Sequence, residues 1–120
     1  MDTFSFNDKP LLDLATLGSL REIYSTPEEL KEIVDLFVAD AKKNIHEISV
    51  SFNDADALRH AAHSLKGSSS VIGAIRLAEV SFQIEICGRN NQLQNVPSFY
   101  QYLKPIYEET MTILLKEVEK

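Results

Sequence analysis

The amino-acid sequence predicts an all-α protein, an antiparallel up-down-up-down four-helix bundle with a short additional N-terminal helix. Only four Gly and four Pro occur in 120 residues, which favours long uninterrupted elements. No stretch alternates apolar and polar residues as a strand does, whereas apolar residues recur every three or four positions over long stretches. Short polar segments separate these stretches and favour antiparallel neighbours. We expect residues 1–120 to form a single domain.

The first predicted elements are a short helix at about Leu11 to Ile23 and a longer helix that begins at Thr26. The segment Thr26-Pro27-Glu28-Glu29 is a helix start, with Thr as the cap, Pro at the first position and Glu three residues after the cap. The apolar residues of the longer helix then follow at helical spacing: Leu30, Ile33, Val34, Phe37, Val38, Ala41, Ile45 and Ile48.

Two further helices are predicted on either side of Gly73. The polar segment 53–56 caps a helix that runs through His63, and Gly73 marks the turn that follows. The helix after this turn is formed by the following residues: Leu77, Ala78, Ser81, Phe82, Ile84 and Glu85.

The last predicted helix spans about Pro97 to Val118, after the polar turn 90–92. Pro105 lies inside this helix. Because proline lacks an N–H group, we expect Pro105 to kink the helix or to remove one of its backbone hydrogen bonds.

A basic segment stands out in this acidic chain. The chain has a formal net charge of −6, yet the window Ala57 to Ala78 contains no carboxylate, where an even spread of the 18 acidic residues would place about three. The window instead holds five basic side chains: Arg59, His60, His63, Lys66 and Arg76. This composition indicates an anion site, and the imidazole of His63 indicates a group that reacts with the anion.

His63 is predicted to lie on the exposed face of its helix. At 100° per residue, Leu58, Leu65 and Ile72 fall on one side, and His63 projects from nearly the opposite side. Gly67 permits two interpretations, since Lys66-Gly67-Ser68 also resembles a helix C-cap followed by a loop. If the helix instead continues through Gly67, the bare backbone there leaves room for a phosphoryl group or a partner.

Three other kinds of site are disfavoured by the residues present. His46, His60 and His63 lack a Glu three residues before them, the pattern of carboxylate-bridged metal bundles, and Lys66 would repel a cation. No Asp lies near His63 in sequence to orient it for a Ser-His-Asp hydrolase. No glycine-rich nucleotide loop is present, so we expect no ATP-binding or autokinase motif and no resident metal.

A run of residues around His63 resembles the signature of histidine-containing phosphotransfer (HPt) domains. The resemblance covers about residues 10 to 118. It rests on the following segments: Ala62-His63-Ser64-Leu65-Lys66-Gly67-Ser68, Gly73-Ala74, Leu77-Ala78 and Ile84-Glu85.

This resemblance implies a phosphocarrier rather than an enzyme. His63 matches the phosphoacceptor, Lys66 a residue near the phosphoryl oxygens, and Gly67 the position that gives access. Glu85 matches the side chain that hydrogen-bonds the imidazole, and Arg89 a basic residue near the site in some members. A turn near Gly73 would place His63 level with residues 81–84, within reach of Glu85.

The implied partners are response-regulator receiver domains, a hybrid sensor histidine kinase, or both. The phosphoryl group would pass from one receiver aspartate to His63 and on to another. No cofactor is expected on this chain, because the Mg²⁺ of such transfers belongs to the receiver in this family. We expect a monomer. Two alternatives stay open, a free-standing protein, which Met1 and the compact length favour, and the end of a larger sensor.

The rival hypothesis is a helical adaptor that binds a receiver or a kinase through the same face without phosphotransfer. The charge of −6 disfavours nucleic acid as a partner. We expect no membrane association and a cytoplasmic location, because residues 1–8 lack a signal peptide and no apolar run spans a bilayer. The lone Cys87 fits a reducing compartment and is interpreted as a packing residue.

Overall fold

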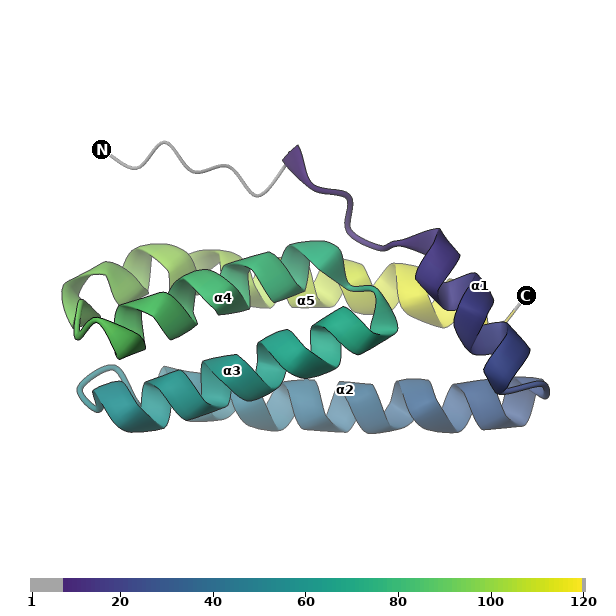
Figure 1. The fold of residues 1–120 in the computed structure, drawn as a ribbon, viewed down its shortest axis with the longest axis horizontal. Helices are drawn as coiled ribbons and strands as arrows, with labels where there is room; N and C mark the ends of the chain where they lie inside the picture. Colours follow the sequence, from purple (N-terminus) through teal and green to yellow (C-terminus); the bar gives the residue numbers. More distant parts are fainter. Residues whose placement is uncertain (1–7, 120) are drawn as a thin grey trace.

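The structure, a computed structural model, describes residues 8–119, and these form helices and connecting segments without a strand. Figure 1 shows the elements in chain order. Their bounds are α1, Leu14–Ile23; α2, Pro27–Ser49; α3, Ala55–Ile72; α4, Ile75–Arg89; the 3₁₀ helix η2, Leu93–Asn95; and α5, Val96–Val118.

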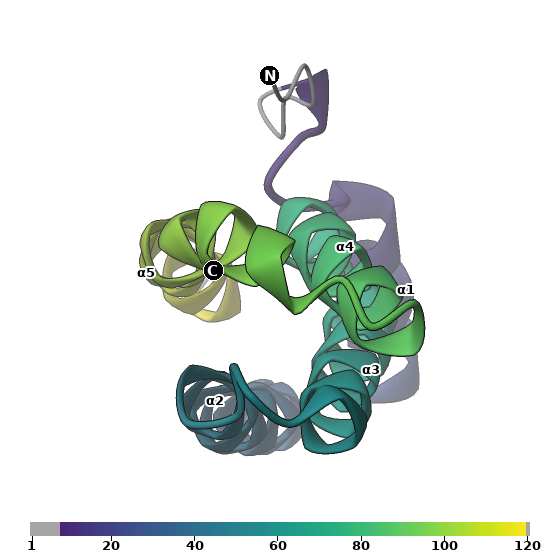
Figure 2. The same cartoon turned by 90° about the vertical axis from the view of Figure 1, so that its left-hand side faces the viewer.

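Helices α2 to α5 form an antiparallel bundle. Each helix runs opposite to the one before it (Figure 1), and the end-on view of Figure 2 shows the four arranged around one centre, with α2 beside α3 and α4 beside α5. The predicted up-down-up-down four-helix bundle with an additional N-terminal helix is confirmed. None of the helices within residues 8–119 combines the length and apolar character needed to span a bilayer.

The helix starts are set by local side-chain hydrogen bonds. Thr26 Oγ1 accepts from the Glu29 N–H at 3.1 Å and donates to Glu29 Oε1 at 3.0 Å, as a capping pair does. Asp54 Oδ1 accepts from the Ala57 N–H at 3.1 Å at the start of α3. These two caps lie where the sequence predicts them.

One helix boundary differs from the sequence-based expectation, and the end of α3 decides between the two interpretations of Gly67. Helix α1 begins at Leu14 rather than Leu11, because Asp13 caps it by accepting from the Ala15 N–H at 3.1 Å. Helix α3 continues through Gly67 to Ile72 and ends at Gly73, whose φ of 81° is left-handed. The alternative in which Gly67 ends the helix is therefore wrong.

Helix α5 runs on through Pro105, which cannot donate a backbone hydrogen bond.

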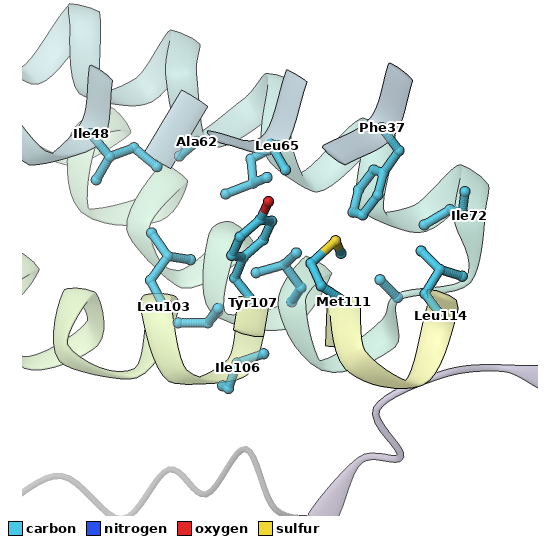
Figure 3. Close-up of a cluster of buried hydrophobic side chains, with 14 of the residues drawn as sticks. Phe37, Ile48, Ala62, Leu65, Ile72, Leu103, Ile106, Tyr107, Met111 and Leu114 are labelled. Carbon is cyan, nitrogen blue, oxygen red and sulfur yellow. The ribbon is translucent and has the colours of Figure 1, made fainter. Parts of the chain in front are cut away.

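The hydrophobic core lies between the four long helices (Figure 3). Most of its members are residues that recur at helical spacing in the sequence, so burying them gives each helix its position in the bundle. The core includes side chains that are at most 5% exposed from all four helices: Phe37, Ile48, Leu65, Ile72, Leu77, Ile84, Leu103 and Leu114.

Helices α3 and α4 approach each other closely, and this approach positions the site. Only Gly73 and Ala74 separate them. A Cβ on Gly88 of α4 would lie 2.9 Å from the Ala55 carbonyl oxygen and 3.0 Å from the Arg59 backbone nitrogen of α3. The backbones are therefore near contact there, and residues in the middle of α3 face residues in the middle of α4.

Helix α1 crosses one end of the bundle, beside the turn between α3 and α4 (Figure 1). The Asp13 N–H donates to the Gly73 carbonyl oxygen at 2.8 Å. Arg21 Nη2 donates to the Glu117 carbonyl oxygen at 2.6 Å, which joins α1 to the end of α5. The short helix thus covers the end of the bundle nearest to this turn.

Candidate functional site

His63 projects from the middle of α3 with 64% of its side chain exposed. Its Nδ1 atom lies 2.9 Å from Glu85 Oε2 on α4, a contact between residues 22 positions apart. The exposed orientation agrees with the helical periodicity, because Leu58, Leu65 and Ile72 occupy the opposite, buried side. One edge of the imidazole is therefore held against the protein while the rest faces solvent.

The Glu85 carboxylate is buried, with only 2% of its side chain exposed, and three basic side chains contact it. His63 Nδ1 and Arg89 Nη2 lie 2.9 and 2.8 Å from Oε2, and Lys66 Nζ lies 2.9 Å from Oε1. Burial by itself raises the pKa of Glu85. Hydrogen bonds from Lys66 and His63, with the positive charge of Lys66, outweigh it and hold the pKa below the ordinary value of 4.5.

The ionised Glu85 fixes which imidazole nitrogen carries the proton. A carboxylate only accepts hydrogen bonds, so His63 Nδ1 must donate its N–H to Oε2. In the neutral imidazole, the lone pair then belongs to Nε2. The exposed nitrogen of His63 is therefore the nucleophilic one, which is the arrangement that an electrophilic phosphorus atom requires.

Lys66 lies one turn after His63 and is held from two sides. Its ammonium group pairs with Glu85 Oε1, and it lies over the ring of Phe82 at 5.2 Å from the centroid. The side chain is 29% exposed. In this position the ammonium group adds positive charge beside His63.

Gly67 and Arg89 complete the set that the sequence singles out. Gly67 is exposed within α3, and a Cβ placed on it would meet no atom within 4 Å. The fold itself therefore does not need a glycine there. Arg89 sits one turn beyond Glu85 on α4 with 56% of its side chain exposed, so it covers the carboxylate from the solvent side.

The remaining basic residues of the carboxylate-free window do not join this cluster. Arg59 pairs with Asp56 at 2.9 Å, one residue outside the window, and His60 lies 3.8 Å from the same carboxylate. Arg76 donates through Nε and Nη2 to the Lys9 carbonyl oxygen, at 2.8 and 2.6 Å. The basic segment thus divides into three separate groups, of which only the one around Glu85 contains His63.

Two features of the site do not follow from the sequence reasoning. The sequence predicts only that Phe82 belongs to the helix after Gly73, whereas the structure places its ring against Lys66. The sequence also gives no reason for Lys66 to pair with Glu85. The sequence signal that bears on these two contacts of Lys66 is the spacing of Phe82 and Glu85, which are three residues apart and thus on one helix face.

Across residues 8–119, no group of three or more His, Cys, Asp or Glu side chains is arranged to hold a metal ion. Cys87 is buried, and burial raises the pKa of its thiol.

The chain as a whole is similar to known proteins. A family model described as the Hpt domain matches residues 32–119. The chain is 36% identical over 86 residues to the phosphorelay intermediate protein rdeA of Dictyostelium discoideum, covering 69% of this chain and 34% of rdeA. It is 35% identical over 91 residues to histidine-containing phosphotransfer protein 5 of Arabidopsis thaliana, covering 66% of this chain and 58% of that protein.

A solved structure with a similar fold is the histidine-containing phosphotransfer protein B from Pseudomonas aeruginosa. The TM-score is 0.84 with 31% sequence identity, and the match covers 92% of this chain and 96% of that chain. The similarity therefore extends over nearly the whole helical bundle. By contrast, the chain spans about a third of one curated relative and somewhat more than half of the other.

Proposed function

The chain belongs to the Hpt domain family, and from this membership we propose that it carries a phosphoryl group on Nε2 of His63 between aspartates of receiver domains. The observation that carries the proposal is the contact between His63 Nδ1 and the ionised Glu85, which leaves the nucleophilic nitrogen exposed. The relatives named phosphorelay intermediate and phosphotransfer protein support the same role.

The transfer exchanges one bond to phosphorus for another and moves no proton through this chain. The Nε2 lone pair attacks phosphorus of the aspartyl phosphate, an N–P bond forms, and the P–O bond breaks with its electron pair returning to the receiver's carboxylate. Nδ1 keeps its proton throughout. The imidazolium formed is offset by Glu85, and the second step reverses this chemistry toward another aspartate.

Lys66 and Gly67 support this transfer in different ways. The Lys66 ammonium offsets charge on the phosphoryl oxygens as they approach His63, an electrostatic role. Gly67 has no side chain, so the surface beside His63 leaves room for the phosphoryl donor to approach. Arg89 shields the buried Glu85 carboxylate at its exposed edge.

The proposed partners are receiver domains, alone or as part of a hybrid histidine kinase. Family members act as phosphocarrier intermediates, and we propose that this chain likewise has no kinase activity of its own. The Mg²⁺ ion for the transfer would be supplied by the receiver, and this chain would act as a monomer with a transient docking surface.

The experiment that tests this function compares wild type with His63→Gln and the matched control His60→Gln. His60 is one turn away on α3 and similarly exposed, at 69% of its side chain. Incubation with a phosphorylated receiver should label wild type and His60→Gln with acid-labile, base-stable phosphate and leave His63→Gln unlabelled. All three should show the same helicity by circular dichroism.

Two outcomes would contradict the proposal. Labelling of His63→Gln would place the acceptor elsewhere. Binding of the receiver without labelling of any variant would favour the adaptor, which holds a partner without chemistry.

A further inference from the structure

The Lys66 ammonium group lies between a carboxylate and an aromatic ring. Nζ is 2.9 Å from Glu85 Oε1 and 5.2 Å from the centroid of the Phe82 ring. Both contacts come from α4, where Phe82 and Glu85 are separated by three residues and so share one face. The two side chains thus define where the ammonium rests.

Lys66 and Phe82 also border a second region of the surface. A surface pocket of about 330 Å³ opens there between α1, the end of α3 and the start of α4. Lys66 and Phe82 both line it, as do the carboxylate-bearing residues Asp13 and Glu79. Asp13 already accepts from the Ala15 N–H and from Thr16 Oγ1, and Glu79 pairs with Lys9 at 3.6 Å. Their negative charges still attract an ammonium group, so a flexible Lys66 without a restraint would also sample this pocket.

We propose that Phe82 is a positioning residue for phosphotransfer, which keeps the Lys66 ammonium at Glu85 beside His63 and away from the pocket lined by Asp13 and Glu79. The inference rests on the proposed function, because it concerns how the same site is organised. The face of an aromatic ring attracts a cation that is partly removed from water, and Lys66 is 29% exposed. Phe82 itself touches neither His63 nor the phosphoryl group in this account.

For the reaction, this means that the Lys66 ammonium group is more often beside His63, where the negatively charged phosphoryl oxygens arrive. In transit, the phosphoryl oxygens approach the exposed edge of His63, one helical turn from Lys66. An ammonium already held at Glu85 needs only a small movement to reach them, whereas one in the pocket must first move out of the region lined by Asp13 and Glu79.

The test compares transfer rates from a phosphorylated receiver for wild type, Phe82→Leu and Phe82→Tyr, each with Lys66 present and with Lys66→Ala. Leucine keeps an apolar side chain without the ring face, and tyrosine keeps the ring. We expect Phe82→Leu to slow transfer roughly two- to fivefold when Lys66 is present. Phe82→Tyr should restore the rate, and Phe82→Leu should have no effect in the Lys66→Ala background.

Nuclear magnetic resonance of Lys66 gives a readout that does not depend on transfer. The ring current of Phe82 should shift the ε-methylene protons of Lys66 upfield in wild type and in Phe82→Tyr, and this shift should disappear in Phe82→Leu. Failure of the proposed function would appear separately, as absence of phosphate on wild type with this shift intact. The inference is overturned if Phe82→Leu slows transfer equally without Lys66, if it leaves the wild-type rate unchanged, or if Lys66 shows no ring-current shift.

Discussion

At the level of single residues, Glu85 connects basic side chains from two helices. It accepts from His63 of α3 and from Arg89 of its own helix, and it forms an ion pair with Lys66 of α3. A buried carboxylate is costly unless it is paired, and here the pairing also orients the imidazole. The same contacts therefore stabilise the packing of α3 on α4 and select the nitrogen that faces solvent.

This pairing predicts a specific dependence of stability on pH. The pKa of Glu85 is lower in the folded protein than its ordinary value of 4.5, so the carboxylate stabilises the fold above that value, and the contribution is lost as the pH falls through the folded pKa. Glu85→Gln should be less stable than wild type at pH 6, and the difference should shrink as the pH is lowered from 5 to 3.

Urea unfolding followed by circular dichroism at several pH values measures this difference. The groups that face Glu85 are His63, Lys66 and Arg89, and the substitution leaves all three in place. A difference that stays constant or grows toward acid pH would contradict the ionised, paired state of the carboxylate.

At this scale the sequence predicts His63 as an exposed residue from periodicity alone. The position of Glu85 beside it follows from the resemblance and from counting residues out from the turn at Gly73. The contact of Lys66 with Phe82 could not be predicted, because helical spacing gives the face of a residue but not the path of a long flexible side chain.

At the level of helices, α3 contains a residue of low helix propensity on its exposed face. Gly67 lies inside the helix, where glycine costs about 1 kcal/mol relative to alanine. Steric crowding does not require it, because a Cβ there meets no atom within 4 Å. Gly73 and Gly88 differ, since a Cβ on either would lie 2.9 Å from a neighbouring atom.

Gly67→Ala should therefore raise stability and impair function at the same time. We expect a gain of about 0.5–1 kcal/mol in the free energy of unfolding. We also expect slower phosphotransfer, because the added methyl group stands on the surface that the donor approaches. The matched control is Gly18→Ala in α1, where a Cβ likewise meets no atom within 4 Å.

The control should gain similar stability and transfer phosphate at the wild-type rate. Chemical denaturation and labelling kinetics on the three proteins measure both quantities. A Gly67→Ala protein that is more stable and equally fast would deny Gly67 a role in access.

The helix boundaries show where local signals suffice and where they do not. Thr26 and Asp54 have the sequence of helix caps and act as caps. The sequence around Gly67 is ambiguous, because the same residues suit a helix end. Leu65 and Ile72 decide the outcome, since both are buried in the core and keep α3 helical on either side of the glycine.

At the level of the whole molecule, the bundle is the scaffold that brings His63 and Glu85 together. The two residues are 22 positions apart, and their contact requires the two-residue turn at Gly73 and the close approach of α3 and α4 at Gly88. Four amphipathic helices with short connections predict this arrangement. The placement of α1 across the end of the bundle does not follow from periodicity, because it depends on contacts of Asp13 and Arg21 with distant residues.

The most direct test of the account is to determine which nitrogen of His63 carries the phosphate. The protein with ¹⁵N-labelled histidine would be phosphorylated by a receiver domain and its imidazole nitrogens observed by nuclear magnetic resonance. We expect one modified histidine, His63, with phosphorus on Nε2 and a proton retained on Nδ1 at Glu85. Phosphate on Nδ1, or on His46 or His60, would contradict it.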